Sequence, residues 1–227
     1  MGLVNRTIVA LIGTDGAGKT TQARWLADWL TGQGLPAAYW RNAGGRRWLG
    51  RLAQRLGRRD AVDLLGADGV LVLEAALRWL AIAQALLRSR LGGRIAVMDR
   101  YAYCQYASIR AHGGRSERWA RLLYSVFPAP DLVCYLAVPA GEAYRRIEAR
   151  GTDHESIAHL AALDVAYRGL PEAGRFVVVD GSGTPAQVRA ALHRAVAASL
   201  TLPADQVDSS EAACRPAAAA ATKYQGS

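Results

Sequence analysis

Residues 7–22 read TIVALIGTDGAGKTTQ, and this stretch decides the fold. It begins with a short apolar run, 7–12, rich in β-branched side chains and typical of a buried strand. Residues 13–20 then match the pattern G-x-x-x-x-G-K-[ST], and a helical spacing of apolar residues follows from about Lys19 to Gln33. A strand, a glycine-rich loop and a helix in this order are the context that a phosphate-binding loop requires.

This loop has the residues needed to hold the phosphates of a nucleoside triphosphate. Its glycines let consecutive backbone amides point inward, and the N-terminus of the following helix adds positive potential. Lys19 places a charge near the β- and γ-phosphates, and the Thr20 hydroxyl is a suitable Mg²⁺ ligand. A glycine-rich turn that only caps a helix would not explain why Lys19 is the one lysine among the first 222 residues. The predicted nucleotide-binding residues are Gly13, Thr14, Asp15, Gly16, Ala17, Gly18, Lys19, Thr20 and Thr21.

Apolar runs alternate with helical patterns along the rest of the chain. Further strands are predicted at about 37–41, 95–98, 132–138 and 176–179, and further helices at about 48–56, 70–87, 141–150, 156–167 and 185–200. Each strand is a nearly continuous apolar run, which is typical of a parallel sheet covered on both faces. The sequence therefore predicts an α/β fold of the P-loop NTPase type, a three-layer sandwich with a five-stranded parallel sheet between helices.

Composition divides the chain into one domain and a tail. Residues 1–202 form the predicted domain, with a lid at about 150–156, whereas residues 203–227 are low in complexity and poor in large apolar side chains. We expect this tail to be disordered, with an alanine run that could be transiently helical. No apolar stretch reaches the roughly 18 residues that a membrane span needs. The three cysteines have neither disulfide nor metal-ligand spacing, which together with the short N-terminal apolar run favours a reducing cytoplasm.

The loop alone does not identify the phosphoryl acceptor. GTPases require a base-reading N-K-x-D segment, which this sequence lacks, and the chain is too short for a multi-domain ATPase. The net charge of +9 would permit nucleic-acid binding, but a strong bias toward arginine accounts for it and no recognition motif is present. A small kinase acting on a small molecule is therefore the best interpretation, with no membrane or nucleic-acid partner expected.

Over roughly residues 5–200 the chain resembles the thymidylate kinases, which are nucleoside monophosphate kinases. Four segments in order carry the resemblance: GTDGAGKTTQ at 13–22, RNAGG at 41–45, AALR at 75–78 and DRY at 99–101. The resemblance implies transfer of a phosphoryl group from ATP, with Mg²⁺, to a nucleoside monophosphate, by default dTMP to dTDP. It also implies a homodimer, for which the long apolar helix at 70–87 is a candidate interface; burial of this helix in the chain's own core is the alternative.

Charged side chains follow the predicted strands at the edge where open α/β sheets bind ligands. Arg41 and Arg100 come at or just after strand ends, and a guanidinium fork suits an acceptor phosphate. A solvated surface position is the alternative for either arginine, and more so for Arg41. Asp99 ends a strand expected beside the loop strand, from where a carboxylate can reach Mg²⁺ through water. A helix cap or a partner for Arg100 is the alternative role for Asp99. Tyr101 either packs on the acceptor sugar or fills the core.

The resemblance adds roles that the residues alone do not establish. Asp15 would contact the sugar hydroxyl of the acceptor, or else stabilise the loop, and Arg78 would read its base. A lid arginine would stabilise the transition state, and Arg150 or Arg146 is the candidate because His154 stands where an arginine is common. A solvated helix end is the alternative for these two arginines. The predicted catalytic residues are Asp15, Lys19, Arg100 and Arg150; the substrate-binding residues are Arg41, Arg78, Asp99, Arg100 and Tyr101; the metal ligands are Thr20 and Asp99.

The acceptor side departs from the family's pattern. Glu74 occupies the position of a base-stacking aromatic, and its spacing of four from Arg78 favours an ion pair on one helix face. The polar S-x-x-A-Y-Q positions that follow DRY in the family are here Cys104, Ala107, Ser108 and Ile109. Two alternatives therefore stay open: a kinase of another phosphorylated metabolite, and a nucleotide-binding protein that transfers nothing.

Overall fold

The computed structural model describes residues 7–42, 61–114, 116–151 and 155–200, with the backbone alone for 61–71 and 74. Its strands are β1 (Ile8–Ile12), β2 (Ala37–Arg41), β3 (Ile95–Asp99), β4 (Leu132–Ala137) and β5 (Val177–Asp180). Its helices are α1 (Lys19–Gly32), α3 (Ala61–Leu91), α4 (Ala102–Ala111), α5 (Glu117–Tyr124), α6 (Ala140–Arg150), α7 (Ile157–Arg168), η2 (Ala173–Arg175) and α8 (Pro185–Ser199).

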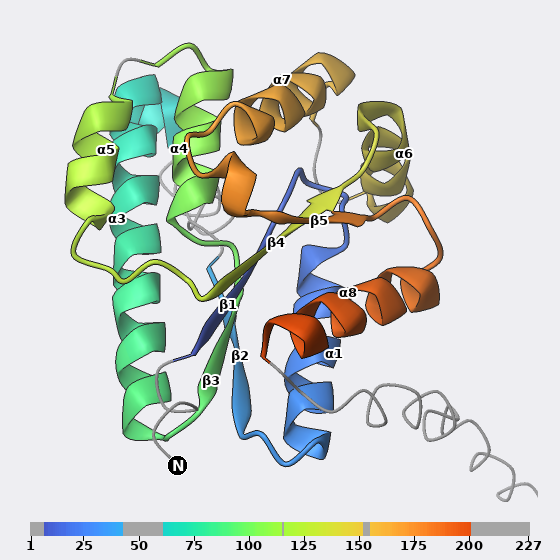
Figure 1. Cartoon of the computed structure of the whole chain (residues 1–227). Helices are drawn as coiled ribbons and strands as arrows, with labels where there is room; N and C mark the ends of the chain where they lie inside the picture. The colour runs from blue at the N-terminus through green and yellow to red at the C-terminus, as the bar shows by residue number, and fades with distance from the viewer. Residues whose placement is uncertain (1–6, 43–60, 115, 152–154, 201–227) are drawn as a thin grey trace, which may run out of the picture.

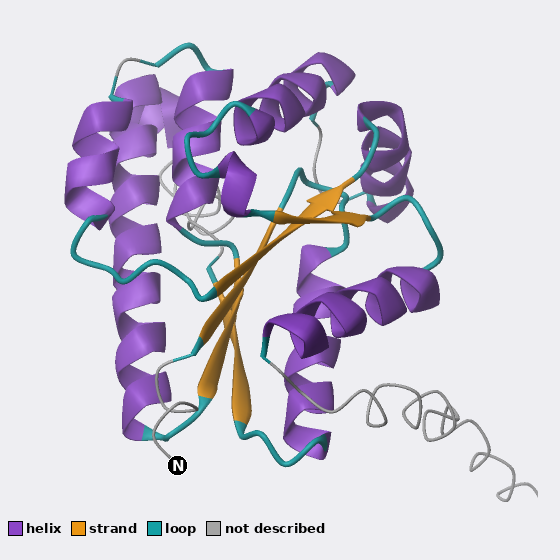
Figure 2. Cartoon of the chain, in the orientation of Figure 1, coloured by secondary structure: helices purple, strands orange, loops and turns teal. Residues whose placement is uncertain are grey.

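The strands form one parallel sheet in the order β2-β3-β1-β4-β5. Helices α1 and α8 cover one face, while α3, α4 and α5 lie on the other (Figure 1). The central strand β1 is buried on both sides, because Val9 and Leu11 join the core beneath α1 and α8, whereas Ile8, Ala10 and Ile12 join the core beneath α3 and α4. Figure 2 shows the single twisted sheet between these groups of helices. The predicted α/β three-layer fold with five parallel strands is confirmed.

The expected helix at 70–87 is longer than predicted, since α3 runs from Ala61 to Leu91. Gly66 and Gly69 weaken the helical signal at its start, and the exposed Arg88 and Arg90 in its last turn interrupt the apolar pattern. None of the helices within the described ranges is long and apolar enough to cross a membrane. The predicted helix at 48–56 and the tail at 203–227 lie outside the described residues.

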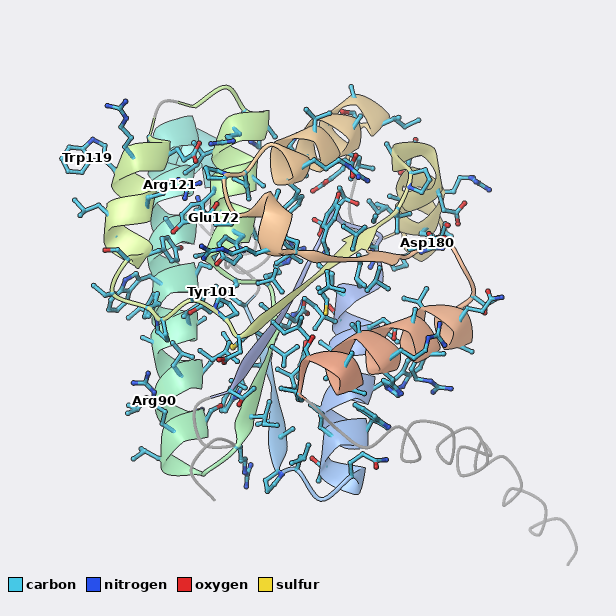
Figure 3. The ribbon with its side chains drawn as sticks, viewed as in Figure 1. Arg90, Tyr101, Trp119, Arg121, Glu172 and Asp180 are labelled. Carbon is cyan, nitrogen blue, oxygen red and sulfur yellow. The ribbon has the colours of Figure 1, made fainter. Side chains whose placement is uncertain are left out.

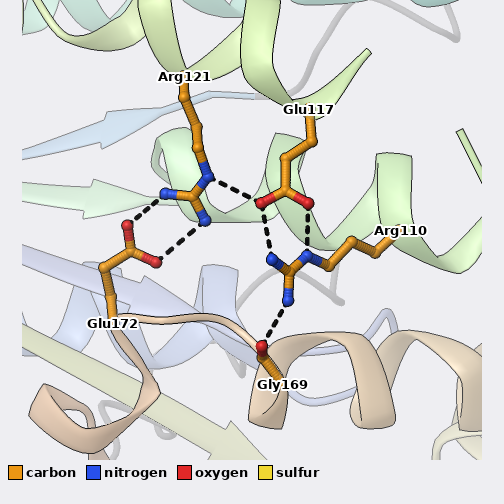
Figure 4. Close-up of polar contacts among 5 residues, drawn as sticks. All are labelled: Arg110, Glu117, Arg121, Gly169 and Glu172. Atoms are coloured by element: carbon orange, nitrogen blue, oxygen red, sulfur yellow. Dashed lines mark hydrogen bonds and ion pairs between the residues drawn. The ribbon is translucent and has the colours of Figure 1, made fainter. Parts of the chain in front are cut away.

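Helices α4 and α5 were not predicted from the sequence, and α5 is held in place by charge. Glu117 accepts from Arg110 Nε at 2.5 Å and from Arg121 Nε at 2.8 Å, and Arg121 Nη1 also donates to Glu172 at 2.5 Å (Figure 4). The opposite side of α5 is apolar and faces solvent: Trp119 is 74% exposed and projects away from the molecule (Figure 3). Glu117 and Arg121 therefore share the inward side of α5 with the buried Ala120 and Tyr124, whereas most of its large apolar side chains face outward, unlike those of a usual amphipathic helix.

Candidate active site

The phosphate-binding loop follows β1 and leads directly into α1, as its sequence predicts. Glycine is required at two of its positions, because a Cβ atom on Gly13 would lie 2.6 Å from the Leu136 oxygen and one on Gly16 would lie 2.5 Å from the Ala143 oxygen. Gly18, the N-cap of α1, has a left-handed φ of 84° and open space where a Cβ would be. The first turn of α1 has no acidic residue and no side-chain cap, which leaves its amides available to an anion.

Lys19, Asp15 and Arg100 form a charge cluster beside the loop. Lys19 is only 5% exposed, and its Nζ donates to the Thr14 carbonyl at 2.5 Å and lies 3.4 Å from Asp15 Oδ1. The same carboxylate oxygen accepts from Arg100 Nη2. Burial favours the neutral form of Asp15, but the charges of Arg100 and Lys19 outweigh burial and hold its pKa well below the usual range. Asp15 therefore stays ionised and connects the loop to the residue after β3.

Arg100 is held in an unusual backbone conformation. Its φ is 81°, and it is the only non-glycine residue with positive φ in the described part of the chain. The residue stays in the sheet register, because its N–H donates to the Leu11 carbonyl at 3.0 Å. Burial alone would lower its pKa, yet the Asp15 carboxylate raises it, so the guanidinium keeps its charge. Left-handed backbone at a non-glycine residue costs about 1–2 kcal/mol and is found most often at functional sites.

Thr20 and Asp99, the two predicted metal ligands, form a hydrogen-bonded pair of side chains close to Lys19. Thr20 Oγ1 donates to Asp99 Oδ2 at 2.6 Å, and the Tyr39 hydroxyl donates to the same oxygen at 3.2 Å. Asp99 is buried at the end of β3, and its Oδ1 is shielded from solvent without a hydrogen-bond partner among the described residues. A buried carboxylate oxygen with spare capacity beside a threonine hydroxyl suits a hard cation such as Mg²⁺. These residues thus fit the metal that the sequence predicts.

On the acceptor side the predicted residues come from neighbouring elements. Arg41 ends β2 opposite Asp99 in the sheet register, and its side chain is exposed. Arg78 of α3 is buried, and its Nε and Nη1 have no hydrogen-bond partner within the described ranges. Tyr101 is also buried, and its hydroxyl donates to the Pro128 carbonyl at 2.7 Å, which favours its interpretation as a core residue. The expected Glu74–Arg78 pair cannot be placed, because the Glu74 side chain lies outside the described residues.

Sequence reasoning missed a polar residue on this side. Gln105 of α4 is only 2% exposed, and its Oε1 has no hydrogen-bond partner in the described structure. Helix α4 begins at Ala102, two residues after Arg100, so Gln105 lies close in sequence to the charge cluster. Because α4 was not predicted, no pattern in the sequence separated Gln105 from an exposed glutamine.

The two candidate lid arginines differ in their surroundings. Arg146 uses all three of its side-chain nitrogens, with Nε on Glu142 and with Nη1 and Nη2 on the carbonyls of Gly181 and Ser182. Arg150 is exposed at the last turn of α6, without an ion pair to any other described residue. Arg150 is thus the one with hydrogen-bonding capacity left for a phosphate. His154 lies outside the described residues.

Known proteins share this arrangement of segments. Residues 12–192 match the family model described as thymidylate kinase. The chain is 34% identical over 197 residues to the thymidylate kinase of Thiobacillus denitrificans, covering 82% of this chain and 94% of that protein. It is 31% identical over 220 residues to the thymidylate kinase of Xanthomonas campestris pv. campestris, covering 91% of each. A third match, 33% over 150 residues, is to a Pyrococcus abyssi protein named "Probable thymidylate kinase" and covers 65% of this chain and 72% of that one.

Proposed function

The chain belongs to the thymidylate kinase family, and we propose that it transfers the terminal phosphoryl group of ATP to dTMP, producing ADP and dTDP. The observation that carries this proposal is the cluster in which Asp15 bridges Lys19 of the donor loop and Arg100 after β3. One carboxylate thereby fixes a cation for the donor phosphates and a cation for the acceptor phosphate side by side. Phosphoryl transfer depends mainly on such positioning and charge stabilisation.

Each residue of the site has a role in an in-line transfer. The loop amides and Lys19 bind the phosphates of ATP, while Arg41 and Arg100 hold the phosphate of the acceptor. Arg150 supplies positive charge to the transferring group. A general base is unnecessary, because the attacking oxygen belongs to a phosphate that is already anionic. Asp15 keeps Arg100 in its fixed orientation and is in position to bind the sugar hydroxyl of the acceptor.

Thr20 and Asp99 would hold Mg²⁺ together with the phosphates of ATP, with Thr20 as a direct ligand and Asp99 acting through water. When bound, the ion neutralises charge that develops on the phosphate oxygens. The Tyr39 hydroxyl, which donates to Asp99 Oδ2, keeps that carboxylate oriented and leaves its Oδ1 available.

Two buried groups support thymine as the base. Among the described residues, Arg78 has N–H groups without acceptors and Gln105 has a carbonyl oxygen without a donor, on helices α3 and α4, which pack together. Thymine presents the complementary pair on its Watson–Crick edge, an O4 acceptor beside an N3–H donor. Cytosine presents the reverse, an amino donor beside an acceptor nitrogen. A guanidinium and a carboxamide oxygen therefore discriminate between the two pyrimidines, because a mismatched base would leave buried groups unpaired.

The proposal is tested by measuring ADP release with ATP and Mg²⁺ against a panel of nucleoside monophosphates. We expect dTMP to be the preferred acceptor, and Lys19→Ala to lower turnover by at least about a hundredfold, the usual effect of removing one group aimed at the reacting charge. Arg88→Ala is the matched control, because Arg88 is an exposed cation remote in sequence from the loop. Nucleotide binding without transfer to any monophosphate would contradict the proposal.

Glu74 supports a second candidate, a kinase of a different phosphorylated metabolite, because a carboxylate cannot stack on thymine. The two candidates make opposite predictions for Glu74→Phe. If dTMP is the acceptor, restoring an aromatic side chain should lower the KM for dTMP. If the acceptor is another molecule, the substitution should impair turnover of that molecule and leave dTMP unused.

The homodimer and the cytoplasmic location also belong to this proposal. Helix α3 exposes Leu80, Leu87 and Leu91 along one stripe, and α5 is joined to α3 by the bond from Trp79 Nε1 to the Leu123 carbonyl at 3.0 Å. An apolar surface of this extent on two adjacent helices suits a second copy of the chain. The unpaired thiols of Cys104 and Cys134 suit a reducing compartment. Sedimentation of the protein and of Leu87→Glu tests the dimer.

A further inference from the structure

Arg146 joins α6 to the connection between β5 and α8. Its Nη1 donates to the Gly181 carbonyl at 2.8 Å and its Nη2 to the Ser182 carbonyl at 3.2 Å, while Nε is held by Glu142 at 3.0 Å. The adjacent Arg145 also pairs with Glu142, at 2.5 Å, but it is 77% exposed and, within the described residues, does not bond to that connection. Figure 3 shows Asp180, the last residue of β5, next to α6. One of two neighbouring arginines is therefore committed to a specific loop.

The connection at residues 181–184 lies directly against the phosphate-binding loop. A Cβ atom on Gly181 would lie 3.7 Å from the Ala17 carbonyl of that loop, an ordinary contact distance, and only 2.6 Å from Val138 Cγ2, so the absence of a side chain matters for packing on the end of β4. The Gly181 N–H donates to the Ala137 carbonyl at 2.8 Å. Downstream, Thr184 begins α8 with a capping box. Both ends of the connection are fixed, and Arg146 fixes the two carbonyls between them.

The order of the strands shows which part of the donor nucleotide would meet this connection. Arg41, Asp99 and Arg100 lie at the ends of β2 and β3, on one side of β1. The terminal phosphate of a nucleotide in the loop must point toward that side to reach the acceptor. The other end of the nucleotide, its sugar and base, then extends toward β4 and β5, where α6 and residues 181–184 lie (Figure 1).

We infer that Arg146 is a positioning residue for the donor: it holds the carbonyls of residues 181 and 182 and so fixes the surface against which the nucleoside of ATP rests. The inference rests on the proposed function, because it requires a nucleoside triphosphate in the loop. The inference gives the two lid arginines different roles: Arg146 acts on the nucleoside end of ATP, and Arg150 acts on the phosphates. Arg146 acts only through residues 181 and 182, so its loss should affect the nucleoside and spare the phosphates.

Calorimetric binding of ATP and of inorganic tripolyphosphate, each with Mg²⁺, tests this division. Tripolyphosphate occupies the loop but has no nucleoside. We expect Arg146→Ala to weaken ATP binding about tenfold or more, as for loss of hydrogen bonds to a charged group, and to change tripolyphosphate binding less than twofold. Arg146→Lys can keep one hydrogen bond to a carbonyl, so its affinity for ATP should lie between those of the wild type and Arg146→Ala. Arg145→Ala is the matched control and should leave the affinity for both ligands unchanged.

Kinetics provide a second readout for the same variants. Arg146→Ala should raise the KM for ATP and leave the KM for dTMP unchanged. Preserved tripolyphosphate binding would show that the variant is folded, because a general loss of structure would abolish binding of both ligands. Equal weakening of ATP and tripolyphosphate binding, or unchanged ATP binding, would overturn the inference while leaving the proposed function intact. A wild-type protein that binds neither ligand would overturn both.

Discussion

Replacing His193 with phenylalanine should remove most of the acid sensitivity of folding between pH 7 and pH 5. His193 of α8 is 6% exposed and stacks on Trp29 of α1, with ring centroids 4.2 Å apart and planes 13° apart. Burial lowers the pKa of His193 from 6.5 to about 4, and the charge of Arg189 acts in the same direction. The ring is therefore neutral in the folded protein at pH 5, whereas in the unfolded chain it is protonated.

The sign and size of the effect follow from proton linkage. The unfolded state binds more protons between the two pKa values, so the free energy of unfolding falls as the pH drops below 6.5. With a folded pKa of about 4, the loss reaches about 2 kcal/mol at pH 5 and about 3 kcal/mol at pH 4. The lowered pKa of Asp15 acts only below its ordinary value of 3.8, so it does not contribute in this window.

Urea unfolding at pH 7.5, 6 and 5, followed by circular dichroism, measures the effect. The wild type should lose about 2 kcal/mol over this range, whereas His193→Phe, which keeps an aromatic ring on Trp29, should lose little. His112→Phe, at an exposed position, should behave like the wild type. The reasoning is refuted if wild type and His193→Phe lose the same stability, because the acid sensitivity would then come from other groups.

Three further outcomes are expected. Asp99→Asn should raise the Mg²⁺ concentration for half-maximal activity by about 10- to 100-fold, because Thr20 would lose its charged partner. A metal titration measures this concentration, and an unchanged midpoint would show that Asp99 does not bind the metal. Arg100→Ala should raise the acceptor KM about tenfold or more in steady-state kinetics, and an unaltered acceptor KM would count against its role. Gly16→Ala should lower Tm by about 5 °C, because the φ of Gly16 is 85° and the new Cβ would lie 2.5 Å from a carbonyl oxygen. Gly32→Ala is the control and should leave Tm unchanged, because nothing lies within 4 Å of its Cβ position.

Local features of the chain made the fold and the donor half of the site predictable. The loop, the lysine and the strand that precedes them lie within sixteen consecutive residues, 7–22, so their geometry depends on short-range contacts. Asp99 and Arg100 were predictable because a parallel sheet brings the carboxyl ends of its strands to one edge. The position of Arg41 opposite Asp99 follows from the same rule.

Residues whose role depends on tertiary packing could not be predicted. Helix α4 reads AYCQYASIRA and is buried nearly all round, so it shows no apolar stripe, and Gln105 within it carries no signal of burial. Helix α5 has the ion-paired Glu117 and Arg121 on its inner side and Trp119 outside, which is the opposite of the pattern that such predictions rely on. Arg145 and Arg146 are adjacent residues of the same type, and they differ only in the tertiary structure, where Arg146 contacts residues 181 and 182.

The distribution of charge explains why the site contains two kinds of arginine. Lys19 and Arg100 face Asp15 and Asp99, and the side chain of Glu155 is also hydrogen-bonded to Asp15, so this part of the site has no excess of positive charge and is held in place by its own ion pairs. ATP and a nucleoside monophosphate together bring several negative charges, which this balanced group cannot neutralise by itself. The extra positive charge must come from Mg²⁺, the loop amides and the two exposed cations, Arg41 and Arg150. In the proposed mechanism Arg100 is preorganised to orient the acceptor, whereas Arg41 and Arg150, which have no ion pair to other described residues, meet the charge that arrives with the substrates.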